Sequence, residues 1–269
     1  MPLLNYNGVI CSDEELLITV RNRALRYGEG LIETMLWQDG NIRRLQLHEK
    51  RAADSLALLG FPAIEPEVWH KALHRTLLAH QDVKTGILRT QFFRDDSLQT
   101  LQYMIELLPL PTAHGAWPER GLYTGICRTA VKASDQISHL KTTSRLCYIV
   151  AGREAAQQGW DDAFLLNPAG RIAESTISNI WIIKDGAAIT PPLSEGCIAG
   201  VFRTALLKNE SIGGITLRQG MLTEQDLQEA DEIFLTNTIR GIQPVSRFNG
   251  REYSSTLTRN LFEQSDAAL

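Results

Sequence analysis

Three turn dipeptides, each with β-prone residues on both sides, place the strongest limits on how this chain can fold. Asn7-Gly8, Asp39-Gly40 and Asp185-Gly186 are pairs that two-residue hairpin turns favour, because the central residues of such turns need a positive φ. Helical patterns lie between the β-rich runs, so we predict an α/β (α+β) fold. The expected hairpins cover residues 3–10, 31–43 and 180–190.

Proline and glycine concentrate near the middle of the chain, between Pro109 and Gly121. This stretch has no hydrophobic period, which is typical of a connection between domains. We therefore expect a small α+β N-terminal domain over residues 1–110, an interdomain linker over 111–121 and a larger C-terminal domain over 122–269. The expected helices span residues 45–59, 66–81, 144–158, 201–208, 224–229 and 256–264, and further strands span 86–93, 101–108, 122–131 and 163–166.

Composition argues against several classes of function. The formal net charge of -4 and the pI near 5.9 give no basic field that would attract nucleic acid or an anionic membrane. No apolar run approaches the roughly 18 residues that a membrane helix needs, and the first residues do not resemble a secretion signal. The four cysteines lack the spacing of a metal or redox site, which fits a reduced, cytoplasmic setting and no bound metal.

Lys141 is the candidate nucleophile. It follows the expected strand 122–131 and comes just before the expected helix 144–158. Most lysines at the edge of an element are solvated surface groups. A lysine can instead form a Schiff base with an aldehyde when its surroundings destabilise the ammonium ion, and other residues of the chain favour this role for Lys141.

Several polar residues are suited to bind such an aldehyde if it carried a ring nitrogen and a phosphate. Glu174 is a candidate partner for the ring nitrogen, although it could also be a simple turn residue. The run Gly196–Phe202 leads into an expected helix, so the N–H groups of Val201 and Phe202 are candidate phosphate donors. Further candidates for the phosphate are Arg51, Thr236 and Thr238.

Six segments follow one another in the order Tyr27–Thr34, His48–Arg51, Lys141, Glu174–Asn179, Gly196–Arg203 and Phe234–Val245. Together they resemble the class IV aminotransferases, which are fold type IV enzymes that use pyridoxal 5'-phosphate (PLP) and include branched-chain and D-amino-acid aminotransferases and aminodeoxychorismate lyase. The resemblance covers nearly the whole chain. It implies a two-domain fold like that of D-amino-acid aminotransferase, with PLP in the cleft between the domains and bound largely by the C-terminal domain, and a homodimer as the functional unit.

The resemblance also implies a role for individual residues. Lys141 is expected to form the internal aldimine with PLP and to move the proton between the substrate Cα and the cofactor. Glu174 is expected to keep the pyridine nitrogen protonated, which makes the ring an electron sink. The phosphate is expected to be held by Arg51, the N–H groups of Val201 and Phe202, and Thr238. The implied activity transfers the amino group of a small amino acid to a 2-oxo acid.

Three arginines are candidates for binding the substrate carboxylate, because a guanidinium offers paired donors to two oxygens. Arg94 falls where D-amino-acid aminotransferases place such an arginine, but the histidine expected two residues later is Asp96. Arg89 falls where some branched-chain enzymes carry one, and it should face the opposite side of an unbulged strand from Arg94. We expect a non-standard D-amino-acid aminotransferase in which Arg89 and Arg26, the latter from the second subunit, bind the α-carboxylate.

Other activities remain open. Aminodeoxychorismate lyase releases 4-aminobenzoate and pyruvate, and the segments Lys141–Leu146 and Thr236–Thr238 are similar to those of the lyase. A branched-chain L-amino-acid aminotransferase is less favoured, because the tyrosine that those enzymes carry five residues after the lysine is Leu146 here. A non-catalytic protein on the same scaffold is disfavoured because Lys141 and Glu174 are both present.

Overall fold

The structure, a computed structural model, describes residues 3–16, 18–94, 100–110 and 115–268. The chain forms two units: unit 1 is Met1–His114 with Leu140–Arg145, and unit 2 is Gly115–His139 with Leu146–Leu269. The segment Leu140–Arg145 packs in unit 1, although the sequence interpretation assigned it to the second domain. Residues 111–114 of the expected linker lie outside the described residues. The mixed α+β class expected from the sequence is confirmed.

Unit 1 is built on an antiparallel sheet with the strand order β2-β1-β6-β5-β3-β4. Asn7 and Asp39 adopt φ values of 51° and are each followed by a glycine with positive φ, as hairpin turns require. The two hairpins expected in this part of the chain are therefore confirmed. The strands are β1 (Leu3–Tyr6), β2 (Val9–Ser12), β3 (Gly30–Gln38), β4 (Asn41–Ile42), β5 (Thr85–Arg94) and β6 (Leu101–Pro109).

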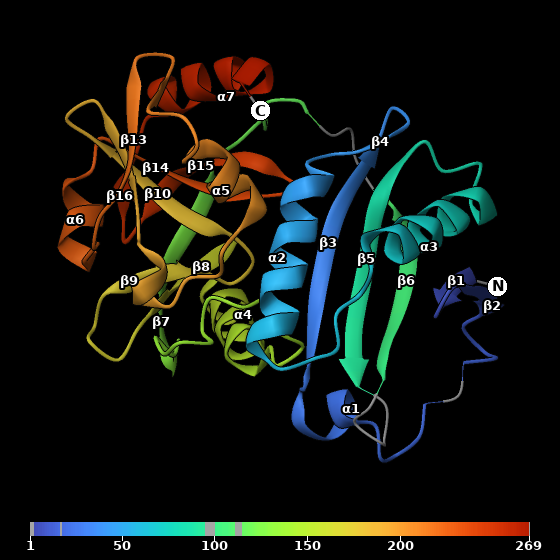
Figure 1. Cartoon of the computed structure of the whole chain (residues 1–269). Coiled ribbons are helices and arrows are strands. Elements are labelled where there is room, and N and C mark those ends of the chain that lie inside the picture. Colours follow the sequence, from blue (N-terminus) through green and yellow to red (C-terminus); the bar gives the residue numbers. More distant parts are fainter. Residues whose placement is uncertain (1–2, 17, 95–99, 111–114, 269) are drawn as a thin grey trace. The chain divides into compact units, whose positions relative to one another are not determined.

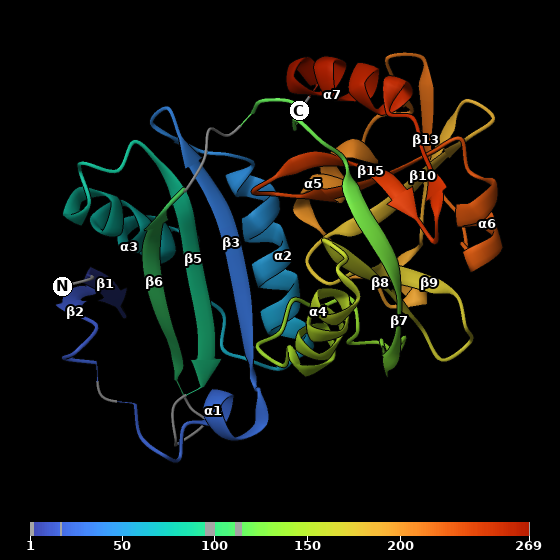
Figure 2. The same cartoon turned by 180° about the vertical axis from the view of Figure 1, so that it is seen from behind.

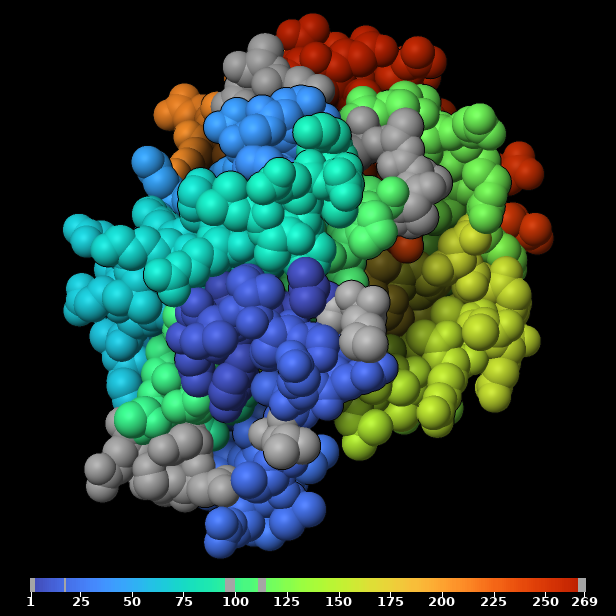
Figure 3. All heavy atoms as spheres, turned by 90° about the vertical axis from the view of Figure 1, so that its right-hand side faces the viewer, coloured from blue at the N-terminus to red at the C-terminus, as the bar shows by residue number. Residues whose placement is uncertain are grey.

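Helices α2 (Leu45–Leu58) and α3 (Pro66–Ala79) cover one face of this sheet (Figure 1). Met35 of β3 and Leu88 of β5 point into that covered core together with Trp69 of α3. Because side chains alternate along a strand, the chain neighbours of Met35 on β3 and of Leu88 on β5 point to the opposite face of the sheet. Figure 2 turns that face toward the viewer. The N-terminal strands, dark blue in Figure 3, lie next to the teal segment that contains α3. A short helix, α1 (Arg23–Tyr27), precedes β3.

Unit 2 contains a larger mixed sheet with the order β12-β13-β11-β10-β14-β15-β7-β8-β9, and β16 pairs with β15. Along β10, Ile180 and Ile182 enter one core while Trp181 and Ile183 enter another, so this strand is buried on both faces. The strands are β7 (Leu122–Val131), β8 (Asp162–Leu166), β9 (Ile172–Ser175), β10 (Asn179–Lys184), β11 (Ala187–Thr190), β12 (Ser211–Ile212), β13 (Ile215–Gln219), β14 (Glu232–Asn237), β15 (Gly241–Phe248) and β16 (Arg251–Glu252).

The helices of unit 2 pack on both sides of this sheet. Helix α4 (Leu146–Gln158) lies against β7 and β8, and α6 (Glu224–Glu229) places Leu227 in the core that holds Ile180. Helices α5 (Val201–Leu206) and α7 (Thr256–Ala268) contribute to the core that holds Trp181, and a short 3-10 turn, η1 (Leu193–Glu195), precedes α5. Across the described residues, we find no helix with the length and apolar character needed to cross a membrane.

Candidate active site

Backbone pairing with the start of β3 holds Lys141 in place. The N–H of Ile32 donates to the carbonyl of Lys141 (2.8 Å), and the N–H of Thr143 donates to the carbonyl of Gly30 (2.9 Å). Glycine is needed at position 30, because a Cβ there would lie 2.7 Å from a carbonyl oxygen of β5. This pairing brings Lys141 next to Thr34, and Nζ lies 2.9 Å from the Thr34 hydroxyl oxygen.

Glu33, His48 and Arg51 form a network of ionisable residues in unit 1. Glu33 of β3 is 3% exposed and accepts two hydrogen bonds from Arg51 of α2, at 2.8 Å to Oε1 and 2.6 Å to Oε2. His48 lies one helical turn before Arg51, and its Nδ1 is 2.6 Å from the same Oε2. Residues three apart lie on one face of a helix, which is why both side chains reach a single carboxylate.

Burial and the charges of this network shift three pKa values. Burial would raise the pKa of Glu33, but the charge of Arg51 and the hydrogen bond with His48 lower it to about 2. Burial lowers the pKa of His48 in spite of its hydrogen bond to Glu33. Burial, and next the charge of Arg51, lower the pKa of Lys141 to about 7, although Glu33 acts in the opposite direction. Lys141 therefore has a substantial neutral fraction near pH 7, and a neutral amine can attack a carbonyl carbon.

Arg89 lies on the face of the unit 1 sheet that carries Thr34. In the sheet register Thr34 is opposite Arg89, and Arg89 is opposite Glu106, so the three side chains form a row across β3, β5 and β6. Arg89 donates to Glu106 at 3.0 Å, and the two side chains are 37% and 34% exposed. The charge of Arg89 also contributes to the low pKa of Lys141. Arg89 therefore presents a solvent-accessible cation on the face where Lys141 meets Thr34.

The side chain of Arg94 makes packing contacts within unit 1. Its Nη2 donates to the carbonyls of Leu59 (2.9 Å) and Gly60 (2.5 Å), and its guanidinium lies 4.5 Å from the ring centroid of Phe61. Strand β5 pairs with β3 and β6 without a bulge, so Arg89 and Arg94 face opposite sides, as the spacing predicted. These contacts fix the Arg94 side chain to the loop after α2.

Arg26 is on an exposed part of unit 1. Its Nε donates to the carbonyl of Val20 (2.8 Å), and its neighbours Leu25 and Tyr27 are 69% and 63% exposed. This hydrogen bond holds the Arg26 side chain along the exposed segment before α1, and among the described residues of one chain it is not brought to Arg89 or Lys141. Asp96, where a histidine was expected, lies outside the described residues.

Glu174 lies in strand β9 of unit 2 and is 2% exposed. The hydroxyl of Tyr148 donates to its Oε1 (2.7 Å), the N–H of Ile198 donates to its Oε2 (3.0 Å), and Nδ2 of Asn179 lies 3.5 Å from Oε2. Hydrogen bonds of this kind stabilise the ionised form of a carboxylate. The alternative that Glu174 is a simple turn residue is wrong, because the residue is a buried carboxylate within a strand.

The run before α5 closes tightly around Asn179. Nδ2 of Asn179 donates to the carbonyl of Ile198 (2.9 Å), and a Cβ at Gly200 would lie 1.9 Å from Oδ1 of Asn179. Gly200 is the N-cap residue of α5, and within the described part of the chain it supplies no side-chain capping hydrogen bond to this helix start. Val201 and Phe202 occupy the first two helical positions, where backbone N–H groups point out of the helix and can bind an anion.

The two threonines at the end of β14 differ in their surroundings. Thr236 is 1% exposed, and its hydroxyl accepts a hydrogen bond from Trp181 Nε1 (3.0 Å), so it serves the core of unit 2. Thr238 lies partly exposed in the turn that follows β14. Of these two candidates, only Thr238 is placed in a turn with access to solvent.

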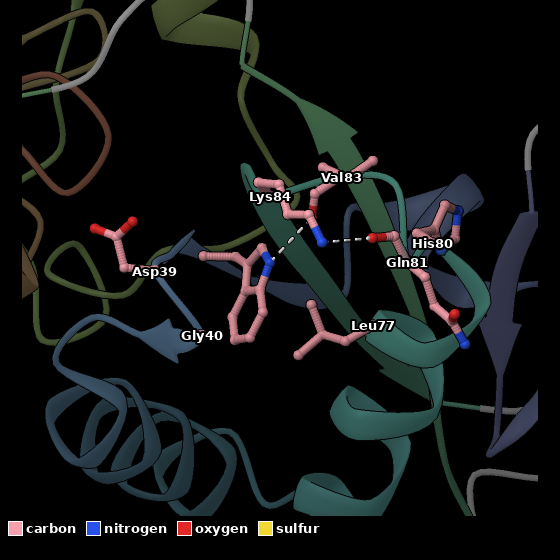
Figure 4. A pocket seen from close by; sticks show the side chains of 8 residues that line it. Asp39, Gly40, Leu77, His80, Gln81, Val83 and Lys84 are labelled. Carbon is pink, nitrogen blue, oxygen red and sulfur yellow. Dashed lines mark hydrogen bonds between the residues drawn. The ribbon is translucent and has the colours of Figure 1, made fainter.

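A further pocket of about 450 Å³ lies at the opposite end of β3 from Gly30 (Figure 4). Its lining includes Trp37, Leu77 and His80, and Trp37 Nε1 donates to the carbonyl of Val83 (3.2 Å). Neither Lys141 nor Arg51 lines it. Within the described part of the chain, no group of three His, Cys, Asp or Glu side chains is arranged to hold a metal ion.

Sequence inspection assigned no role to Glu33, Thr34 or Tyr148, which contact the candidate residues directly. A signal for Glu33 was present, since it lies between Leu31 and Met35 on the apolar face of a strand, where a lone carboxylate needs a buried cation. Tyr148 gave no comparable signal, because its partner lies on a strand remote in sequence.

Comparison with known proteins identifies the family. The model of the family "Amino-transferase class IV" matches residues 30–248. An aminodeoxychorismate lyase of Vibrio harveyi is 26% identical over 87% of this chain and 89% of its own length. A D-alanine aminotransferase of Bacillus licheniformis is 24% identical over 95% of this chain and 93% of its own. The crystal structure of a branched-chain aminotransferase from Thermoproteus uzoniensis superimposes with a TM-score of 0.86 at 25% identity, covering 97% of this chain and 92% of that one.

These matches have similar coverage but carry names of different activities, so they identify the family without resolving the substrate. The family match extends over most of the chain and includes both Lys141 and Glu174. The chain therefore belongs to the class IV aminotransferases, the PLP-dependent transaminases of fold type IV.

Proposed function

We propose that this protein transfers the amino group of a small amino acid, with D-amino acids preferred, to a 2-oxo acid. The observation that carries the proposal is the amine of Lys141, whose pKa is lowered to about 7 on the sheet face that also carries Arg89. An amine that is partly neutral near pH 7 is suited to bind an aldehyde cofactor and to act as a base. A D-alanine aminotransferase that is 24% identical over 95% of the chain supports a D-amino-acid substrate, and relatives named as branched-chain aminotransferases at 28% identity keep an L-amino acid as the alternative that the test below must separate.

The charged and polar groups described above fit PLP. Lys141 would be the point of covalent attachment, and the buried Glu174 carboxylate would pair with the pyridine nitrogen. Arg51, the N–H groups of Val201 and Phe202, and Thr238 would hold the phosphate, because they supply a cation, two backbone donors at a helix start and a hydroxyl. PLP, when bound, supplies an electron sink for the electron pair left at the substrate Cα.

Residues of this chain would accept and return the proton of the substrate Cα. Nζ of Lys141 accepts the proton that the substrate Cα loses and returns it later in the reaction, which requires a neutral amine at the pH of turnover. Burial, and next the positive charge of Arg51, favour this neutral form by lowering the pKa of Lys141, and the hydroxyl of Thr34 orients Nζ from 2.9 Å away. Both effects arise within unit 1.

Arg89 is the proposed partner of the substrate carboxylate, together with Arg26 from a second copy of the chain. A carboxylate arriving at Arg89 would compete with Glu106, whose bond to Arg89 is partly solvent-exposed and therefore costs little to break. Arg94 is not part of this proposal, because its guanidinium is bound to two carbonyls and lies over Phe61.

The same observation on Arg94 favours a second candidate, aminodeoxychorismate lyase. A D-amino-acid aminotransferase of the usual kind would use an arginine at this position for the substrate carboxylate, and here that side chain serves packing. The similarity to the Vibrio harveyi lyase, 26% over 87% of the chain, points the same way. The lyase reaction needs no 2-oxo acid acceptor, which separates it from a transaminase.

A spectral titration tests these alternatives. Purified protein with PLP is titrated with D-alanine, D-glutamate, L-glutamate and L-leucine in turn, without any 2-oxo acid, and the absorbance of the bound cofactor is followed. Conversion to the pyridoxamine form by the D-amino acids alone supports the proposal, and conversion by L-leucine alone contradicts it. If no amino acid acts but aminodeoxychorismate yields 4-aminobenzoate and pyruvate, the lyase is the function. Lys141→Ala should lose both the bound-cofactor absorbance and turnover.

We also propose that the active form is a cytoplasmic homodimer. Val20, Leu25 and Tyr27 lie close together in the sequence and are 76%, 69% and 63% exposed, and exposed large apolar side chains of this kind favour self-association. All four cysteines are free thiols, which fits a reducing compartment. Sedimentation analysis that finds only a monomer in the active protein would contradict the dimer.

A further inference from the structure

Tyr148 donates its hydroxyl to the buried carboxylate of Glu174. The residue lies on α4 and is 8% exposed, with its ring in a core that includes Ala151. The distance of 2.7 Å from the hydroxyl to Oε1 is that of a charge-assisted hydrogen bond. The N–H of Ile198 donates a separate hydrogen bond to Oε2, so the two oxygens of Glu174 accept hydrogen bonds from different segments of the chain. A phenylalanine would fill the same core volume, and the packing alone does not require the hydroxyl.

A buried cation lies behind the Tyr148 ring. Lys132 follows β7 directly and is 6% exposed; its Nζ donates to the carbonyl of Ser138 (2.7 Å) and lies 5.9 Å from the centroid of the Tyr148 ring. A cation over the face of a phenol withdraws electron density from it, which makes the hydroxyl a better donor. Lys132, Tyr148 and Glu174 thus form a polar chain inside unit 2.

Other ionisable groups also act on Glu174. Arg203 and Cys197 are electrostatically coupled to it. Burial raises the pKa of Cys197 to about 12, so its thiol stays neutral, and burial lowers the pKa of Arg203 without removing its charge at neutral pH. The surroundings of Glu174 therefore supply hydrogen-bond donors and positive charge, and both stabilise its anion.

We propose that Tyr148 is a positioning residue that keeps the shared proton on the pyridine nitrogen of PLP instead of on Glu174. This inference rests on the proposed function, in which Glu174 pairs with that nitrogen. The proton has two possible places, on the nitrogen with Glu174 ionised or on Glu174 with the nitrogen neutral. A hydrogen bond that stabilises the Glu174 anion favours the first, and the protonated ring is the stronger electron sink.

The experiment measures the protonation of the pyridine nitrogen directly. Holoenzyme is prepared with PLP labelled with ¹⁵N in the ring, and the ¹⁵N resonance is compared among wild type, Tyr148→Phe and Tyr253→Phe. Tyr253 is the matched control, because its hydroxyl makes an internal hydrogen bond of 2.8 Å to the carbonyl of Leu227 but does not contact Glu174. Free PLP in acid and in alkali gives the positions of the protonated and neutral nitrogen.

Tyr148→Phe is expected to shift the proton equilibrium toward Glu174 by about tenfold, the effect of one charge-assisted hydrogen bond, and to move the ¹⁵N resonance toward the neutral position. Tyr253→Phe should leave the resonance where it is in wild type. Lys132→Met leaves the Tyr148 hydroxyl and the Glu174 carboxylate in place, so it should move the ¹⁵N resonance in the same direction as Tyr148→Phe but by less. This variant also tests the role of Tyr148 if Tyr148→Phe fails to fold.

The ¹⁵N resonance separates a role of Tyr148 from loosening of unit 2 and from failure of the proposed function. A resonance that stays at the wild-type position in Tyr148→Phe overturns the role of Tyr148 while the proposed function stands. A shift of equal size in Tyr253→Phe also overturns it, because the cause would then be general loosening of unit 2. A neutral nitrogen in wild type, or failure of wild type to bind PLP, overturns the proposed function itself and this inference with it.

Discussion

The amine of Lys141 lies 2.9 Å from the hydroxyl of Thr34, a residue 107 positions earlier in the chain. The contact joins the segment Leu140–Arg145 to β3, where backbone hydrogen bonds already pair the two. Glu33, next to Thr34, binds Arg51 on the other face of the same strand. Burial lowers the pKa of Lys141 most, and the charged residues that shift it further, Arg51 and Glu33 among them, belong to unit 1.

Lys141→Met should stabilise the protein without PLP near neutral pH. The pKa of Lys141 is about 7 when folded and 10.5 by its ordinary value, so the unfolded chain binds the proton more readily. The resulting cost to the folded state is complete below pH 7, and it fades as the pH rises toward 10.5. At about 1.36 kcal/mol per pH unit, this cost is at most about 5 kcal/mol. Denaturant unfolding of the apoprotein at pH 6.5 and at pH 10 measures it.

The matched control for this prediction is Lys71→Met, because Lys71 is an exposed lysine of α3. The gain in unfolding free energy of Lys141→Met over the wild type should shrink between pH 6.5 and pH 10, whereas Lys71→Met should differ little from the wild type at either pH. An equal gain at both pH values would mean that added apolar packing, not the proton, explains the effect.

Arg51→Gln and Glu33→Gln should move the pKa of Lys141 in opposite directions. The charge of Arg51 lowers this pKa and that of Glu33 raises it, so removing Arg51 raises the pKa above about 7 and removing Glu33 lowers it further. Reductive methylation requires the neutral amine, and mass spectrometry of the Lys141 peptide from the apoprotein as a function of pH gives the midpoint. Midpoints that move together in the two variants would contradict the electrostatic explanation.

Gly200→Ala should weaken PLP binding, because the new Cβ would lie 1.9 Å from Oδ1 of Asn179 and displace the side chain that bonds Ile198 beside Glu174. We expect at least about a tenfold loss of PLP affinity and a destabilisation of about 1–3 kcal/mol. Gly152→Ala is the control, since a Cβ at this helical position meets nothing within 4 Å and should stabilise by about 0.5–1 kcal/mol. Fluorescence titration with PLP distinguishes them, and equal affinities for the two variants would count against the tight fit around Asn179.

The sequence was most informative where local chemistry determines the backbone. The hairpin turn at Asp185-Gly186 was correctly predicted because a positive φ favours those residues, and β7 spans residues 122–131 as expected. Strand β15 was not predicted, and Pro244 within it argues against a strand by its missing N–H. Its place is set by pairing with β14 and β7, which no local pattern encodes.

Long-range contacts also limited what could be predicted of the site. Lys141 could be proposed from the sequence only together with its companion segments, and its attachment to unit 1 depends on a backbone pairing with Ile32 that joins distant parts of the sequence. The packing role of Arg94 depends on the loop at Gly60, which nothing in the Arg94 segment reveals. The burial of Glu174 within a strand, likewise, became visible only with its neighbours from α4 and the run before α5.

Arg89→Ala and Arg94→Ala should affect different properties. Arg89→Ala removes the accessible guanidinium opposite Thr34, so KM for the preferred amino acid should rise about tenfold to a hundredfold with little change in unfolding free energy. Arg94→Ala removes two hydrogen bonds to the loop after α2 and the contact with Phe61, so it should destabilise by about 1–3 kcal/mol and leave KM nearly unchanged. Steady-state kinetics and thermal unfolding of both variants measure the two effects. If KM rises only in Arg94→Ala, the substrate carboxylate binds where D-amino-acid aminotransferases usually hold it, and the role proposed for Arg89 is wrong.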